Sequence, residues 1–162
     1  MTRQKGFDRL IEMFAAQSDA DSRLTLLGAG PLNSELKTLA ARLGVADRVD
    51  FPGFIERPWA LISGADAFLL PSRWEGMPNA ALEALACGVP VIATPESGGI
   101  SEVAEQSPPG AVTVAEAGPD FIAAMRRVLT RQQIGLRPSL LPPAYRIESV
   151  IDRFEEWLEL DA

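Results

Sequence analysis

The chain has 162 residues, of which 47% are hydrophobic and 23% charged, proportions that are ordinary for one globular domain with a substantial core. Its net charge of −7 disfavours nucleic acid as a partner, because neutralising a phosphate backbone normally takes a basic face. With no histidine and a single cysteine, Cys87, the sequence excludes an internal disulfide and argues against a dedicated zinc site.

Short apolar runs typical of β-strands alternate with helical periodicity along the chain. Helices are predicted at 7–16, 32–43, 58–62, 79–86, 101–105, 121–129 and 147–160, and strands at 24–27, 49–51, 67–70, 89–93 and 111–114. Strands that are apolar on both faces and separated by helices indicate a parallel sheet covered on two sides, with about five or six strands. We therefore predict a single doubly wound, Rossmann-like α/β domain, with strands 67–70 and 89–93 at its centre.

Ligands of doubly wound domains bind at the carboxyl ends of the strands. This places the candidate binding site in the loops 28–31, 52–57, 71–79 and 94–100. Such a domain is expected to open with a strand, whereas helical periodicity here begins by Phe7. We therefore expect the chain to begin within a βαβ unit, as a fragment of a longer protein.

Glu83 is the only charged residue between Asn79 and Thr94, and its neighbours at 80–82 and 84–86 are all Ala or Leu. On a largely buried helix an unpartnered carboxylate costs on the order of several kcal/mol. A carboxylate near the carboxyl edge of the sheet can instead accept hydrogen bonds from the two hydroxyls of a ribose. The alternative interpretation is a glutamate on a solvated helix face or tied to a protein donor.

Glu75 lies in the Gly/Pro loop that leads into the same helix. Backbone N–H groups of Met77, Asn79 and Ala80 at the helix N-terminus favour a phosphate. Glu75 would then lie beyond that phosphate, where a polyhydroxylated group such as a sugar suits a carboxylate acceptor. Asn79 also fits the N-cap of the helix, a role that would explain it without any ligand.

The segment 75–94, EGMPNAALEALACGVPVIAT, resembles the E-x7-E signature of family 4 retaining glycosyltransferases of the GT-B fold. Further segments resemble that family in order and spacing from residue 3 to about 105: QKGFD at 4–8, LLGAGP at 26–31, VDFPGF at 49–54, ADAFLLPS at 65–72 and GGISEV at 98–103. The ordered series is far more specific than any one of its members.

The resemblance implies a role for each matching residue. Lys5 would contact the diphosphate of a nucleotide-sugar donor, Glu75 the hydroxyls of the transferred sugar, and Glu83 the ribose hydroxyls. The remaining positions implied are the glycine turn (Gly28, Gly30), the border of the base (Phe54, Ile55) and the loop near the distal phosphate (Gly76, Met77, Asn79, Ala80). The donor would be a UDP- or GDP-sugar, and transfer would need neither a bound metal nor another cofactor.

The resemblance covers only the C-terminal, donor-binding half of a GT-B enzyme. It implies that an N-terminal domain outside residues 1–162 holds the acceptor, and that any membrane contact is made through that half of a cytoplasmic protein. Two features depart from the family. Pro78 stands where many members have Gly, which removes one amide donor, and the family's arginine a few residues before the lysine falls outside this chain.

Three other functions fit parts of the sequence. A dinucleotide-dependent oxidoreductase would use Gly28 and Gly30, but its third glycine would fall at position 33, where Asn33 stands. A sugar-nucleotide 2-epimerase shares the two-domain fold, although the E-x7-E spacing argues against it. A non-catalytic sugar-nucleotide-binding domain is the third alternative, and measured transfer by the full-length protein would separate it from an enzyme.

Overall fold

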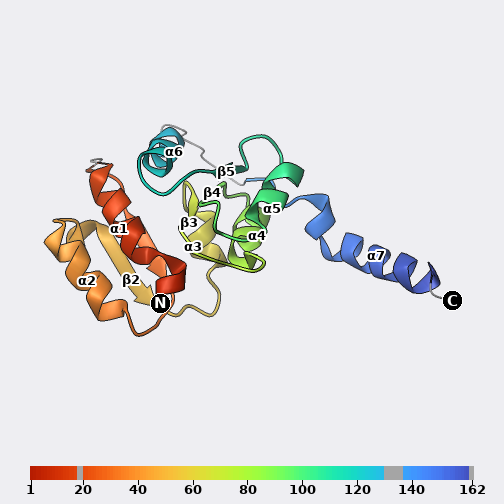
Figure 1. Cartoon of the computed structure of the whole chain (residues 1–162), viewed down its shortest axis with the longest axis horizontal. Helices are drawn as coiled ribbons and strands as arrows, with labels where there is room; N and C mark the ends of the chain where they lie inside the picture. The colour runs from red at the N-terminus through yellow and green to blue at the C-terminus, as the bar shows by residue number, and fades with distance from the viewer. Residues whose placement is uncertain (18–19, 130–136, 161–162) are drawn as a thin grey trace.

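The computed structural model describes residues 1–17, 20–129 and 137–160 (Figure 1). The strands are β1 (Leu24–Leu27), β2 (Val49–Gly53), β3 (Phe68–Leu70), β4 (Val91–Ala93) and β5 (Val112–Val114). The helices are α1 (Phe7–Ala16), α2 (Asn33–Arg42), α3 (Trp59–Ser63), α4 (Asn79–Ala86), α5 (Ile100–Gln106), α6 (Pro119–Leu129) and α7 (Ile147–Leu160), with short 3-10 turns at Arg3–Lys5, Ala46–Arg48 and Pro143–Tyr145. Every predicted element is present, and its ends agree within two residues.

The described strand pairs are all parallel, which confirms the predicted α/β class. β1 pairs with β2, and β4 lies between β3 and β5. In the described ranges β1 and β3 do not pair, so the strands form a two-stranded and a three-stranded sheet rather than one continuous sheet. β4 is central as predicted, but the central position predicted for 67–70 is wrong, since β3 lies at an edge.

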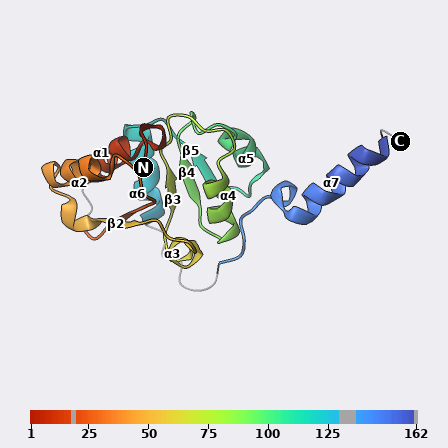
Figure 2. The same cartoon turned by 90° about the horizontal axis from the view of Figure 1, so that it is seen from below.

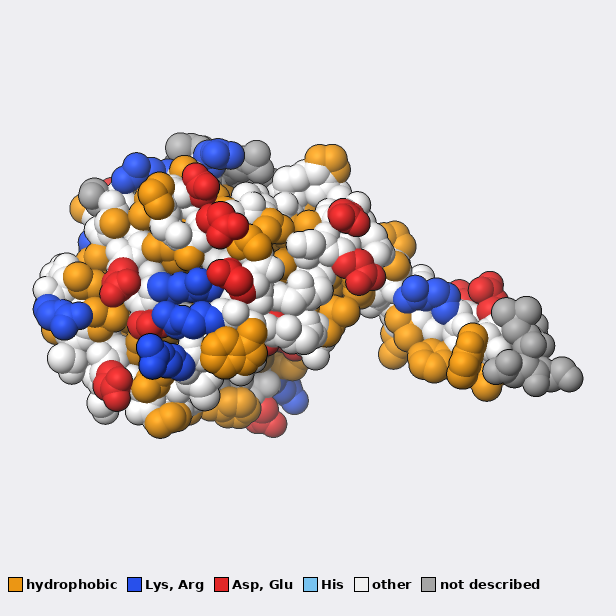
Figure 3. All heavy atoms as spheres, viewed as in Figure 1, with side chains coloured by type: hydrophobic (Ala, Val, Ile, Leu, Met, Phe, Trp, Pro, Cys, Tyr) orange, Lys and Arg blue, Asp and Glu red, His pale blue; other side chains and the backbone are white. Residues whose placement is uncertain are grey.

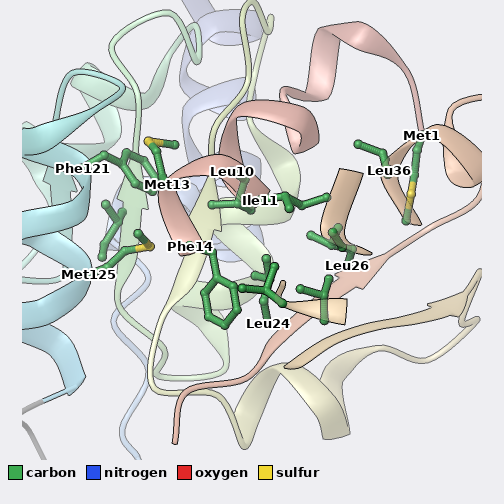
Figure 4. Close-up of a cluster of buried hydrophobic side chains, with 14 of the residues drawn as sticks. Met1, Leu10, Ile11, Met13, Phe14, Leu24, Leu26, Leu36, Phe121 and Met125 are labelled. Atoms are coloured by element: carbon green, nitrogen blue, oxygen red, sulfur yellow. The ribbon is translucent and has the colours of Figure 1, made fainter. Parts of the chain in front are cut away.

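The core consists of two clusters of buried side chains. In the first, α6 packs against α1 and β4, and Figure 4 shows the ring of Phe14, on α1, beside Leu24 of β1. The buried residues of α1, among them Leu10, Ile11 and Phe14, recur at helical spacing, which is why the sequence predicted an amphipathic helix. The second cluster joins α4 and α5 to β3 and β4, with Leu85 fully buried within it. The first cluster fixes α1, and the second fixes α4, against the rest of the domain.

Gly6 determines how α1 leaves the 3-10 turn that precedes it. Its φ of 64° lies in the left-handed region, and a Cβ at this position would overlap the carbonyl oxygen of Pro71. Only glycine adopts this backbone without strain while another chain segment lies so close. Gly6 therefore allows residues 1–5 to lie against the loop that follows β3.

We expect Gly6→Ala to lower the free energy of unfolding by about 2 kcal/mol or more, because a left-handed alanine alone costs roughly 1–2 kcal/mol and the Pro71 carbonyl must also move. Gly64→Ala is the matched control, since Gly64 has a φ of −86° and its nearest atoms would be 3.6 Å from a new Cβ. Urea unfolding measures both. Equal losses in the two variants would show that the close approach at Gly6 is unimportant.

Helix α7 projects from the rest of the chain (Figures 1 and 2). Its apolar residues lie along one face and are exposed, as the orange side chains in Figure 3 show: Ile147, Ile151, Phe154, Trp157 and Leu158. This spacing is that of an amphipathic helix. The helix is nevertheless too short and too polar to cross a membrane, and the same holds for the other helices within the described ranges.

Candidate functional site

The loops that follow β1 and β2 meet the first residues of the chain at one edge of the two-stranded sheet. The Gly28 N–H donates to the Gly53 carbonyl at 2.8 Å, which continues the strand pairing into the loops. The Met1 ammonium donates to the Ala29 carbonyl, and a Cβ on Gly30 would overlap the Met1 backbone. Gly30 thus allows Met1 to lie directly against this turn, whereas a Cβ at Gly28 would meet no neighbouring atom.

Residues 1–6 also contact the loops at the end of the three-stranded sheet. The Arg73 N–H donates to the Gln4 carbonyl at 2.7 Å, and the Gly99 N–H donates to the Gly76 carbonyl at 3.0 Å. The loops after β1, β2, β3 and β4 are therefore linked into one continuous edge. The structure brings together the four loops in which the sequence predicted a binding site.

Lys5 and Glu75, which the resemblance places at the donor diphosphate and at the transferred sugar, form an ion pair at this edge. Lys5 Nζ donates to Glu75 Oε1 at 2.7 Å, and the Ser72 hydroxyl donates to the same oxygen at 2.7 Å. The Glu75 side chain is 9% exposed, whereas that of Lys5 is 44% exposed. Gln4 Nε2 donates to Glu75 Oε2 at 3.4 Å and to the Trp74 carbonyl at 3.0 Å. The site thus joins a largely buried carboxylate to a solvent-accessible ammonium.

A buried polar network lies beneath this ion pair, where β3 and β4 end. Arg9 donates to the carbonyls of Pro71 at 2.8 Å and Ser72 at 2.6 Å, and to the Thr94 hydroxyl at 3.1 Å. Thr94 Oγ1 also donates to the Ser72 carbonyl at 2.8 Å and lies 3.1 Å from the Ser97 hydroxyl. The network fixes the backbone from which Glu75 projects, because buried polar groups held by several partners have few alternative arrangements.

Asp8 and Arg73 form a second link between α1 and the loop after β3. The guanidinium donates to both carboxylate oxygens, at 2.7 and 2.8 Å, and to the Arg3 carbonyl at 2.9 Å. These hydrogen bonds from Arg73 hold the pKa of Asp8 below its ordinary value of 3.8. The contribution of this pair to stability is therefore present above about pH 4 and is lost as the pH falls through the lowered pKa.

Glu83 is exposed, so the expectation that it lies on a largely buried helix is wrong. Helix α4 buries a single face, formed by Ala81, Ala84 and Leu85. Alanines also occupy much of its exposed face, which made the whole helix look apolar in the sequence. Burial raises the pKa of the nearby Cys87 thiol, and the negative charge of Glu83 adds to that rise. The structure leaves the Glu83 carboxylate accessible to a ligand.

Helix α4 starts differently from the prediction. Asn79 is its first residue rather than its N-cap, and Pro78 takes the capping position without a side-chain hydrogen bond. The Pro78 carbonyl accepts the Ala81 N–H at 2.9 Å, so the first turn begins one residue earlier than expected. The Asn79 N–H donates to the Met77 carbonyl at 3.0 Å. This amide, one of those predicted to bind a phosphate, therefore already has a partner within the protein. Gly76, Met77, Asn79 and Ala80 are exposed.

Phe54 and Ile55 follow β2, at the far end of the same edge. The Phe54 side chain is 79% exposed and Ile55 is half-buried. An aromatic ring left in solvent beside a ligand edge can stack on a flat heterocycle. Their role at the border of the base stays a prediction.

Sequence reasoning assigned no role to Gln4, Arg9, Ser72 or Thr94, although they surround Glu75. Their signal was weak, because each is a common residue type. Apart from the local Ser72–Glu75 and Thr94–Ser97 contacts, their hydrogen-bond partners lie 22 to 85 positions away along the chain. Within the described ranges no three His, Cys, Asp or Glu side chains form a group that could hold a metal ion.

Parallel strands alternating with helices define a Rossmann-like α/β domain. The chain belongs to the family described as glycosyl transferases group 1, whose model matches residues 1–139. A putative colanic acid biosynthesis glycosyltransferase, WcaL of Salmonella typhimurium, is 37% identical over 121 residues, which cover 68% of this chain and 29% of WcaL. A GDP-mannose-dependent phosphatidylinositol dimannoside mannosyltransferase of Mycobacterium tuberculosis is 42% identical over 94 residues, covering 55% of this chain and 24% of that enzyme.

Solved structures confirm the fold as half of a GT-B enzyme. The apo form of the lipopolysaccharide outer core galactosyltransferase WaaB matches with a TM-score of 0.79 at 21% identity. HepE of Anabaena, solved in complex with UDP and glucose, matches with a TM-score of 0.76 at 23% identity. Each match covers 98% of this chain but 46% of the solved chain. The chain therefore spans less than half the length of the proteins to which it is similar.

Proposed function

We propose that residues 1–162 form the donor-binding domain of a retaining glycosyltransferase, which binds a nucleoside-diphosphate sugar at the carboxyl edge of its strands. The observation that carries this proposal is the Lys5–Glu75 ion pair, with Nζ and Oε1 2.7 Å apart among glycine-rich loops. A cation suits the diphosphate and a carboxylate suits sugar hydroxyls. The pair thus supplies one group for each half of such a donor.

The reaction breaks the bond between the anomeric carbon of the sugar and the distal phosphate oxygen. The diphosphate leaves with the bonding electrons, the acceptor oxygen forms the new bond to the anomeric carbon, and the proton of the acceptor hydroxyl passes to the departing phosphate oxygen. Lys5, which is exposed enough to move from Glu75 to a phosphate, would offset the negative charge that develops on the leaving group. The N-terminus of α4 would contribute in the same sense, so we expect transfer to proceed without a bound metal.

Glu83 and Phe54 are assigned to the nucleoside. Both are exposed beside loops of the carboxyl edge, Glu83 to accept the ribose hydroxyls and Phe54, with the backbone of Ile55, to border the base. Two relatives point to the donors to test first, since one is GDP-mannose-dependent and another was solved with UDP. UDP- and GDP-sugars are therefore the proposed donors.

An acceptor-binding domain outside these residues would complete the active site. Two observations support it: the relatives are more than twice as long as this chain, and α7 exposes an unpartnered apolar face. Burial of that face would contribute on the order of 25 cal/mol per Å² of apolar surface covered. The acceptor itself would be held by that second domain.

A calorimetric binding screen with UDP, GDP, ADP, UDP-glucose, GDP-mannose and NAD tests the donor proposal. We expect binding of one nucleoside diphosphate and its sugar, with at least tenfold weaker binding of NAD, because the third glycine of a dinucleotide site is replaced by Asn33. Preferential binding of NAD would favour an oxidoreductase. An absence of binding to every nucleotide in the screen would contradict the proposed function.

A further inference from the structure

The two oxygens of the Glu75 carboxylate are held unequally. Oε1 accepts hydrogen bonds from Lys5 Nζ and from Ser72 Oγ, both at 2.7 Å. Oε2 accepts a longer bond, of 3.4 Å, from Gln4 Nε2, whose shorter contact is with the Trp74 carbonyl at 3.0 Å. Short hydrogen bonds to a charged oxygen are the stronger ones. Oε1 is therefore occupied by two short hydrogen bonds from the protein, while Oε2 can accept a hydrogen bond from a further donor.

Ser72 is fixed far more firmly than the other donor on Oε1. Its side chain is fully buried, and its carbonyl accepts bonds from Arg9 at 2.6 Å and from Thr94 at 2.8 Å. The backbone of Ser72 is therefore held in one position, from which its hydroxyl reaches Glu75. A buried hydroxyl that lost this acceptor would be left without a hydrogen-bond partner, which is unfavourable.

Lys5 differs from Ser72 because its side chain is 44% exposed on a long, unbranched stem. When a diphosphate binds, Lys5 can exchange the carboxylate for a phosphate with little change in burial. Ser72 cannot leave, so its hydrogen bond persists in the ligand-bound state. Without it, nothing equally rigid would hold Oε1 once Lys5 had moved.

We propose that Ser72 is a positioning residue whose hydroxyl anchors Oε1 of Glu75 and thereby presents Oε2 to the hydroxyls of the bound sugar. The proposal rests on the function proposed above for Glu75. It assigns Ser72 a role in recognition of the sugar and none in recognition of the nucleotide, because Glu75 is the one partner of its hydroxyl among the described residues.

The experiment measures how much the sugar contributes to binding. For wild type and each variant, calorimetry gives Kd for two pairs of ligands, UDP with UDP-glucose and GDP with GDP-mannose. In the pair that binds, the ratio of the two Kd values measures the contribution of the sugar. Ser72→Ala should weaken binding of the nucleotide sugar, relative to its nucleoside diphosphate, by about tenfold, which corresponds to about 1.4 kcal/mol. The Kd for the nucleoside diphosphate itself should stay within about twofold of wild type. Ser72→Thr, which keeps the hydroxyl, should restore most of the ratio.

Ser97→Ala is the matched control. Ser97 is equally buried and belongs to the same network, but its hydroxyl donates to the Leu70 carbonyl at 3.2 Å and does not touch Glu75. Both variants should lose stability, and only Ser72→Ala should lose sugar discrimination. An unchanged ratio in Ser72→Ala, or equal losses in both variants, would overturn the positioning role.

Glu75→Gln separates this proposal from the one beneath it. If that variant alters the ratio and Ser72→Ala does not, the role of Glu75 stands and the inference about Ser72 fails. If wild type binds none of the four probes, or if Glu75→Gln leaves the ratio unchanged, the role proposed for Glu75 fails and the inference fails with it.

Discussion

Replacing Lys5 by methionine should lower the rate of sugar transfer by the full-length protein about 100- to 1,000-fold, the scale for removing one group that stabilises developing negative charge. Methionine keeps most of the aliphatic stem and removes the charge. Binding of the donor should weaken less than transfer slows, because the leaving diphosphate carries more charge in the transition state than in the bound donor. Steady-state kinetics with the donor identified by the binding screen measures both effects.

Lys37→Met is the control for Lys5. Lys37 lies on α2, where its ammonium is 5.7 Å from the centre of the Phe51 ring. Its replacement should leave the transfer rate within about twofold of wild type, as expected for a surface substitution away from a site. A Lys5→Met enzyme as fast as Lys37→Met would contradict the assignment of the diphosphate to Lys5.

Replacing Glu83 by glutamine should weaken nucleotide binding by roughly 1–3 kcal/mol, or about 5- to 150-fold, the scale for losing charge-assisted hydrogen bonds. A 2′,3′-dideoxynucleotide should bind weakly to wild type and lose little further in the variant, since the diol and the carboxylate are partners in one interaction. Calorimetry on the four combinations of protein and nucleotide measures this coupling.

Stability supplies the second readout for Glu83. Because the side chain is exposed on α4, Glu83→Gln should leave the melting temperature unchanged, as should Glu105→Gln on the exposed face of α5. Glu105→Gln should also leave nucleotide affinity unchanged. An unchanged affinity together with a lowered melting temperature in Glu83→Gln would instead make Glu83 a structural residue.

The periodicity of the sequence was sufficient to locate the elements and the edge where the loops meet. Strands such as Val91–Ala93 are short and apolar on both faces, and α1 carries its buried residues at helical spacing, so local patterns and the fold agree. The continuity of the sheet could not be predicted in this way, because hydrogen bonding between strands depends on which segments lie side by side rather than on the pattern within each.

The errors at α4 have a common physical cause. Alanine fits both a buried and an exposed helix face, so a run of alanines around Glu83 does not reveal which side faces the core. The N-cap prediction for Asn79 failed because Pro78 adopts the capping position one residue earlier. Residue type indicated the correct helix in both cases, but tertiary packing decided its orientation and its start.

The partners of Glu75 could be predicted only in part. Lys5 and Glu75 were both identified, through their resemblance to family motifs, but their contact joins residues 70 positions apart. Ser72 and Gln4 stood within the same motifs without an assigned role. A hydrogen-bonded network of this kind becomes visible only when the loops that carry its members are placed next to one another.

Chemical-shift mapping by NMR of the 162-residue chain tests the central claim most directly, with the nucleotide sugar that binds in the screen titrated into labelled protein. We predict that the largest amide shifts cluster at Lys5, at 54–55, at 76–77, at 79–80 and at Glu83, and that UDP or GDP alone reproduces all but those nearest Glu75. Saturable shifts confined to another surface, such as the hollow lined by Lys37 and Phe51, would contradict it.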